Sequence, residues 1–172
     1  DDFLALVISR RTQLVMDQTR DVEPKLVEKL CEAAAWAPNH QQTWPWRFGV
    51  FTGESRRGLG EVAAEAMKRR GDAENKVEKT RTKYLRAPVI IVVGTAPGDS
   101  ELQTEENRDA VAAGIQNLLL GATAMGLGGA PGRADWPATA DKRASGWAGE
   151  LILMPPPSRW LPTLPPATPA AA

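Results

Sequence analysis

Residues 88–128 read PVIIVVGTAPGDSELQTEENRDAVAAGIQNLLLGATAMGLG. The fold class depends mainly on this segment. The run from Val89 to Val93 is apolar without polar alternation, which predicts a central strand buried on both faces. An acidic start at Glu105 leads into a helix that we expect to continue to Leu127 and that is apolar on nearly every side. Such a helix must be buried, and in a chain of 172 residues this predicts contact with a second subunit.

The sequence before this segment predicts four further helices and one further strand. Apolar spacing predicts a first helix with Arg10 and Arg11 at its far end, and a second helix that begins near Pro24 and is stopped by Pro38. Alternating large and small residues predict a strand over residues 46–52. The charged, Ala-rich residues 55–86 predict two solvent-facing helices with a break at Gly71.

The composition changes sharply at Gly129. Nine of the 14 prolines lie in the last 44 residues, which contain no Val, Phe or Tyr. Such a segment has little capacity to form strands. We therefore expect residues 1–129 to be the folded domain and residues 130–172 to be a divergent Pro/Ala-rich segment, either disordered or the product of a reading-frame shift.

Charge and residue counts exclude several classes of protein. The 21 basic and 21 acidic side chains give no global attraction to nucleic acid or to an anionic membrane. The longest apolar run is far shorter than the roughly 20 residues of a membrane-spanning helix, and no signal peptide opens the chain, so we expect a cytoplasmic protein. One Cys and one His form neither an intrachain disulfide nor a soft-ligand zinc site, so we expect no metal.

Sequence motifs for nucleotide binding and hydrolysis are also missing. The glycines at 126, 128 and 129 follow a helix rather than a strand and are followed by Pro131, so they do not form a dinucleotide-binding fingerprint. No phosphate loop of the NTPase type and no nucleophile elbow occurs in the chain.

Three groups of residues have two interpretations each, and the simpler one is favoured in each case. The carboxylates Glu105, Glu106 and Asp109 form either an acid/base group or, as we expect, a solvated acidic first turn. The stretch 68–86 is either a nucleic-acid patch or a solvated face of mixed charge. Cys31 is a small buried hydrophobe rather than a reactive thiol.

Two segments offer chemistry suited to a ligand. Arg10, Arg11 and Thr12 supply two permanent cations and a hydroxyl, although an Arg pair at the end of a helix more often compensates the helix dipole. The loop WAPNHQQTWPW, residues 36–46, combines three Trp, two Pro and His40. Flat apolar faces beside directional donors suit an aromatic cofactor, and aromatic packing under a rigid turn is the alternative.

Taken together and in this order, these segments resemble the FMN-dependent nitroreductase family. The likeness is to its small single-domain bacterial branch, in which the first helix carries R-R-[ST] and the loop reads A-P-[DN]-H-x-x-x-x-P-W. It extends to RAPVIIVV and AGIQNLLLGATAMGLG and covers about residues 1–129. The resemblance implies an α+β fold, with a mixed, mostly antiparallel sheet flanked by helices, in an intimate homodimer that holds two FMN molecules at its interface.

The same resemblance implies roles for individual residues, and none of them is a catalytic side chain. Arg10, Arg11 and Thr12 contact FMN, and Trp36 and His40 match further FMN-contacting positions. The segment Gly121, Ala122, Thr123, Ala124, Met125 and Gly126 matches a nicotinamide-nucleotide contact, and Arg133 lies close to an expected FMN-binding Arg. The position before Pro-Trp, often Gln in the family, is Trp44 here.

The activity implied is an FMN-dependent NAD(P)H oxidoreductase. NADH or NADPH delivers hydride to flavin N5, and the reduced flavin passes electrons to a nitroaromatic, a quinone or a similar small electrophile, with no nucleic-acid or membrane partner. After Gly129 the family expects an aromatic-Arg-[ST]-Gly segment and a strand of the form IVGxxYLG, and neither is present. The alternative is therefore a degenerate, non-catalytic flavin-binding protein.

Overall fold

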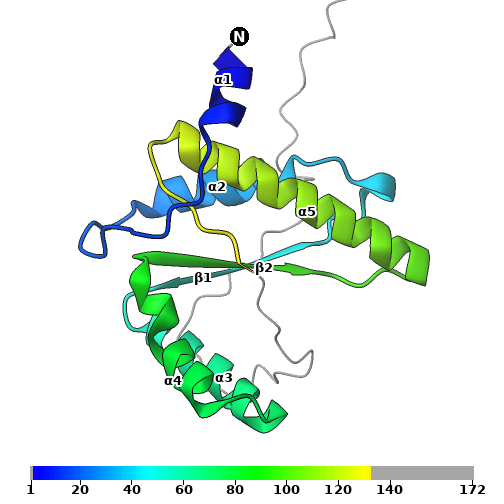
Figure 1. The fold of residues 1–172 in the computed structure, drawn as a ribbon. Coiled ribbons are helices and arrows are strands. Elements are labelled where there is room, and N and C mark those ends of the chain that lie inside the picture. The colour runs from blue at the N-terminus through cyan, green and yellow to red at the C-terminus, as the bar shows by residue number, and fades with distance from the viewer. Residues whose placement is uncertain (1, 133–172) are drawn as a thin grey trace, which may run out of the picture.

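A computed structural model describes residues 2–132 of the chain (Figure 1). Five helices and two strands follow one another in the order α1 (Asp2–Ser9), α2 (Pro24–Ala35), β1 (Trp46–Thr52), α3 (Ser55–Arg70), α4 (Glu74–Lys83), β2 (Val89–Thr95) and α5 (Glu101–Ala124). Two short 3-10 turns, η1 (His40–Gln42) and η2 (Tyr84–Arg86), lie between them. The described part is therefore an α+β fold, as expected.

The strands form a two-stranded antiparallel sheet in the described part of the chain. Trp46 pairs with Thr95, and Val50 pairs with Ile91. Helices α2 and α5 cover one face of this sheet and α3 and α4 lie on the other side, so the fold has three layers (Figure 1).

The main core lies between the sheet and the α2–α5 layer. Its buried members come from α2, the loop after it, β1 and α5, namely Val27, Cys31, Ala34, Ala37, Trp46, Phe48, Ala110 and Val111. Cys31 is one of them, which confirms its expected burial. Burial, with a smaller effect of the Glu28 charge, raises the pKa of the Cys31 thiol to about 11, so the thiol stays neutral at physiological pH.

Helices α2 and α5 run antiparallel and are in close contact at Gly114. A Cβ atom placed on Gly114 would lie 2.5 Å from Trp46 Nε1 and 2.6 Å from the Ala34 carbonyl oxygen. One helical turn further along α5, Asn117 Nδ2 donates to the Ala33 carbonyl at 3.2 Å. Only glycine fits at position 114, and this contact sets the spacing of the two helices.

The expected burial of β2 on both faces is wrong for the described residues, and the expected burial of α5 against a second subunit stays a prediction. Strand β2 is half-buried along its whole length rather than buried on both faces, because β1 is its one bonded neighbour in the described residues. Helix α5 is also only partly covered. Ala112, Ala113 and Gln116 are exposed, and the three leucines at 118–120 are half-buried.

Candidate functional site

The loop between α2 and β1 holds a strained backbone. Gln41, Gln42 and Trp44 have φ angles of 57°, 53° and 49°, in the left-handed region that side-chain-bearing residues rarely adopt. Each such residue costs about 1 kcal/mol or more, so the surrounding structure must hold the loop in place. The loop between α2 and β1 is therefore a candidate for a functional segment.

A chain of partly buried hydrogen bonds holds this loop to α5. Thr43 Oγ1 lies 2.9 Å from the side-chain amide of Asn39 and 2.5 Å from Asn107 Oδ1. Since a hydroxyl has one proton, Thr43 donates to Asn107, and Asn39 donates to Thr43. Asn107 is 2% exposed, and its Nδ2 donates onward to the Ala96 carbonyl at 3.1 Å. The strained loop is thus joined through one buried amide to α5 and to the end of β2.

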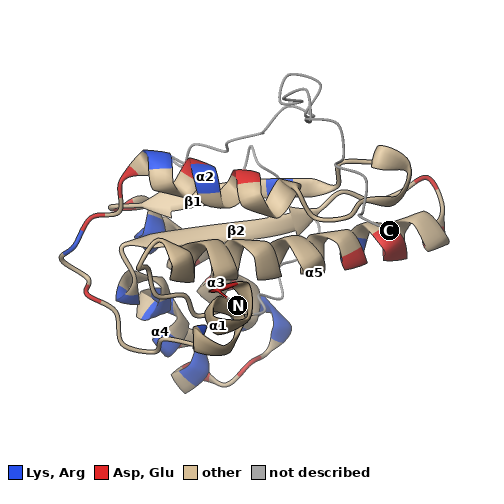
Figure 2. Cartoon of the chain, turned by 90° about the horizontal axis from the view of Figure 1, so that it is seen from above, with Lys and Arg blue, Asp and Glu red and all other residues tan. Residues whose placement is uncertain are grey.

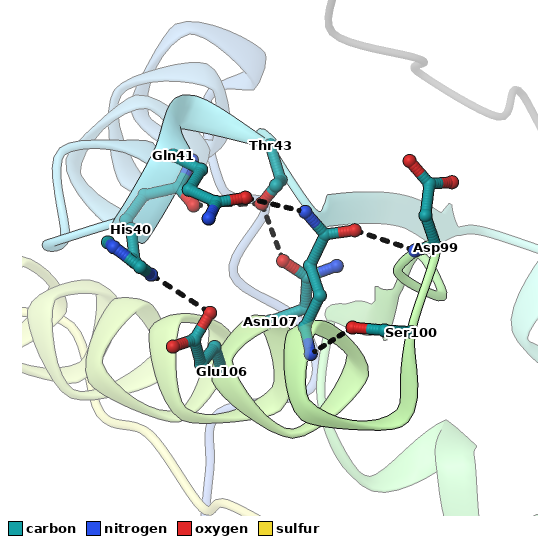
Figure 3. A network of polar contacts seen from close by, with 9 residues as sticks. His40, Gln41, Thr43, Asp99, Ser100, Glu106 and Asn107 are labelled. Atoms are coloured by element: carbon teal, nitrogen blue, oxygen red, sulfur yellow. Dashed lines mark hydrogen bonds and ion pairs between the residues drawn. The ribbon is translucent and has the colours of Figure 1, made fainter.

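Two further side chains of the loop meet the start of α5 (Figure 3). Nδ1 of His40 lies 2.9 Å from Oε2 of Glu106. Gln103 Nε2 donates to Oε1 of Gln41 at 3.0 Å, and Gln103 Oε1 accepts from the Asp99 backbone N–H at 2.6 Å. Gln103, Glu106 and Asn107 share one face of the helix, because residues three and four apart lie next to one another.

The expected solvated acidic first turn at Glu105 is therefore wrong in part. Helix α5 begins four residues earlier, at Glu101, and Ser100 caps it by accepting from the Gln103 N–H at 3.1 Å. Glu106 consequently lies in the second turn and pairs with His40 instead of facing only water. The missed signal is the sequence Ser100 to Gln103, which has the S-x-x-Q spacing of a capping box.

Arg10, Arg11 and Thr12 lie at the opposite end of α5. Thr12 forms an isolated parallel bridge with Gly129, and the Gln13 N–H donates to the Gly129 carbonyl at 3.1 Å. Arg11 Nη1 donates to the carbonyls of Ile8 and Arg10, so part of its guanidinium compensates the end of α1. This contact agrees with the alternative interpretation of the Arg pair, and it leaves further N–H donors of Arg11 for a ligand.

The segment from Gly121 to Gly126 is the last turn and the cap of α5. Gly126 has a φ of 70°, and the Leu127 N–H donates to the Ala122 carbonyl at 2.8 Å, which ends the helix three residues before the expected position. Ala122 is buried, and Thr123 Oγ1 donates to the Leu119 carbonyl at 3.0 Å within its own helix. Ala124, Met125 and Gly126 are the exposed members of the segment.

The structure divides the predicted site residues into two groups. His40 meets the start of α5 at Glu106, and Trp36, which is 51% exposed, follows the end of α2, whereas Thr12 pairs with Gly129 beyond the end of α5. The distance along α5 from Glu106 to Gly121 is about 22 Å at the rise per residue of a helix. Arg133 lies outside the described residues.

Charge on the surface follows the sequence expectation. The positive charges of α3 and α4 alternate with acidic partners, since Arg81 pairs with Glu61 and Glu78, and Arg70 pairs with Asp72 (Figure 2). Helix α5 carries no charged residue from Ala110 to Ala124. Among residues 2–132, no helix is long and apolar enough to cross a membrane, and no group of three or more His, Cys, Asp or Glu side chains could hold a metal ion.

Comparison with protein families and curated proteins gives a consistent result. Residues 7–132 match the model of the nitroreductase family. The chain is 27% identical over 129 residues to "Putative NAD(P)H nitroreductase YdjA" of Escherichia coli, and 27% identical over 125 residues to YfhC of Bacillus subtilis, which bears the same description. These alignments cover 74% and 71% of this chain, and 70% and 64% of those relatives.

Solved structures show the same fold. A nitroreductase-like family protein from Bacillus cereus matches with a TM-score of 0.64 and 28% identity, over 73% of this chain and 66% of that one. A nitroreductase with bound FMN from Bacteroides fragilis matches with a TM-score of 0.58 at 19% identity, over 73% of this chain and 66% of that one. The chain thus spans about two thirds of the length of these relatives.

Proposed function

The chain belongs to the nitroreductase family, and from that premise we propose that it is an FMN-dependent NAD(P)H oxidoreductase acting on small electrophiles such as nitroaromatics or quinones. The observation that carries the proposal is the docking of Arg10, Arg11 and Thr12 beside the glycine-rich end of α5, through the bridge of Thr12 to Gly129. The relatives named as NAD(P)H nitroreductases and the neighbour with bound FMN support the same activity.

The donors at this end of α5 fit the phosphate of FMN. Arg10 and Arg11 are cations with planar N–H groups, and Thr12 adds an exposed hydroxyl. Gly128 and Gly129 allow the backbone to approach closely, since a Cβ on either residue would lie within 3.1 Å of Gln13 or Leu119 side-chain atoms. When bound, FMN would supply the hydride chemistry, and this chain would supply binding, orientation and positive charge.

We place the complete site across a homodimer. The roughly 22 Å along α5 from Glu106, the partner of His40, to Gly121 is too long for one chain to place both His40 and the Arg10–Thr12 group around a single flavin ring. A second protomer would bring its Trp36 and His40 to the Arg10–Thr12 group of the first. Leu4 and Ile8 of α1 are 54% and 59% exposed in the single chain, and the uncovered side of α5 offers further apolar surface for this contact.

An absorbance titration tests the proposal. The protein supplied with FMN should show a bound flavin band that bleaches on anaerobic addition of NADH or NADPH. The double variant Arg10→Ala/Arg11→Ala should bind FMN about 10²–10⁴-fold more weakly, because it loses two charge-assisted contacts that each contribute about 1.5–3 kcal/mol. Arg57→Ala is the matched control. This exposed Arg of α3 pairs with Glu54, away from the two groups of predicted site residues.

The second candidate is a non-catalytic flavin-binding protein. It is favoured by the length of the match, because the chain spans only 64–70% of the two curated relatives. A bound flavin band that NAD(P)H does not bleach would support this candidate. No bound flavin at all would contradict both candidates. The identity of the electron acceptor and a location in the cytoplasm stay predictions.

A further inference from the structure

The contact between His40 and Glu106 determines where the imidazole carries its proton. Nδ1 lies 2.9 Å from the Glu106 carboxylate. An ionised carboxylate only accepts hydrogen bonds, so this contact requires a proton on Nδ1. In the neutral ring Nε2 is then an acceptor, and in the charged ring it is a second donor.

The loop is fixed just after His40 by two further contacts. Gln41 accepts from Gln103 at 3.0 Å, and Thr43 donates to Asn107 at 2.5 Å. These contacts hold Gln41 at a φ of 57°, a conformation that persists only where the surroundings impose it. The His40 side chain is 65% exposed, and Figure 3 shows the far end of its ring pointing away from Glu106.

We propose that Glu106 is a positioning residue that holds the His40 imidazole with its proton on Nδ1 and presents Nε2 to the flavin. This inference rests on the proposed function for the identity of the ligand, and on the contacts of the loop for the role of Glu106. The family resemblance gives a role to His40 and none to Glu106. Because the carboxylate holds the proton on Nδ1, Nε2 of the neutral imidazole is available to a bound flavin ring as a hydrogen-bond acceptor.

The first test reads the tautomer directly. The sequence has one histidine, so a long-range proton–nitrogen correlation spectrum of the isotope-labelled full chain reports His40 alone. The wild type should show the proton on Nδ1 of the neutral ring. Glu106→Gln should keep it there, since the amide oxygen still accepts, whereas Glu106→Ala should revert to the Nε2-protonated form that free imidazole prefers. Glu105→Ala, at the exposed neighbouring position, is the matched control.

A wild-type spectrum with the proton on Nε2, or an Ala variant with the wild-type tautomer, would overturn the role of Glu106. Circular dichroism of each variant separates this result from unfolding. The second test measures FMN binding, which Glu106→Ala should weaken about 3–10-fold and Glu106→Gln should largely restore. An altered tautomer with unchanged FMN affinity would overturn the flavin part of the inference. A wild type that binds no FMN would overturn the proposed function and the flavin part together, while the spectra still decide whether Glu106 sets the tautomer.

Discussion

The two ends of α5 differ in how the rest of the chain contacts them. At the start, Gln103, Glu106 and Asn107 each bond to a side chain of the 39–44 loop, and Asn107 is buried. At the other end, two backbone contacts to Gly129 join the N-terminal segment to the residues after the helix. Large apolar side chains are exposed in both regions: Trp36 and Leu102 toward the start of α5, and Phe3, Leu4, Ile8, Leu14, Val15 and Met125 in the N-terminal segment and at the other end of α5.

This difference indicates which part of the site a single chain can form. The start of α5 satisfies its polar groups internally and should be ordered without any ligand. The end of α5 leaves cations and apolar surface exposed, where we propose that the cofactor and a second protomer bind. Substitutions on α5 and in the core beneath it test this difference.

The largest effect is expected at Gly114, where α2 and α5 touch. Gly114→Ala places a Cβ 2.5 Å from Trp46 Nε1 and 2.6 Å from the Ala34 carbonyl, both in the core. We expect the free energy of unfolding in urea to fall by about 3 kcal/mol. Gly58→Ala on α3, where a Cβ meets nothing within 4 Å, should instead raise it by about 0.5–1 kcal/mol. A Gly114→Ala protein as stable as wild type would contradict the close packing.

The next effect concerns pH and Cys31, which lies under the middle of α5. Its pKa is about 11 in the folded chain, against 9.0 as its ordinary value. Between these pH values the unfolded thiol loses its proton and the folded one keeps it, so stability falls as pH rises. The total loss is about 2–3 kcal/mol. Cys31→Ala removes this titration, and its unfolding free energy should fall less steeply over the same range. Parallel curves would contradict the burial of the thiol.

A smaller effect is expected from the buried amide at the start of α5. Asn107→Ala removes the acceptor of the Thr43 hydroxyl and the donor to the Ala96 carbonyl, which should cost about 2 kcal/mol of unfolding free energy. Asn117→Ala, which removes one bond to Ala33 at a half-buried position, should cost about 1 kcal/mol. Equal losses in the two variants would show that the start of α5 is no better fixed than its middle.

Near the open end of α5 the expected effect is smallest. A Cβ on Gly121 would lie 3.1 Å from Leu30 Cδ2, the tip of a flexible side chain that can move aside. The gain in helix propensity offsets that adjustment, so Gly121→Ala should change the unfolding free energy by less than about 1 kcal/mol. A loss as large as that of Gly114→Ala would remove the contrast between the two positions.

Most of the fold was predictable from local patterns. The periodicity of α2, the alternation in β1 and the break at Gly71 each reflect a local property, and the structure confirms these elements. The predictions were wrong where the burial or the boundary of an element depends on the residues that contact it. The burial of β2 depends on how many strands join it, and the start of α5 depends on the cap at Ser100.

The candidate site was predictable only in part. The motif around Arg10 and the loop with His40 stand out by composition, and their roles come from the family resemblance. The pairing of Glu106 with His40 was not predictable, because the two residues are 66 positions apart and a paired carboxylate looks the same in sequence as a solvated one. The separation of the two groups along α5 likewise required the antiparallel packing of α2 on α5.

The bridge between Thr12 and Gly129 sets an order for folding during synthesis. Its two residues lie more than a hundred positions apart, so α1 leaves the ribosome long before its docking site exists. Closing so long a loop costs entropy that only the completed α5 end can offset. The first helix to be made is therefore the last to dock, and a nascent chain that stops before Gly129 carries the exposed Leu4 and Ile8 without that anchor.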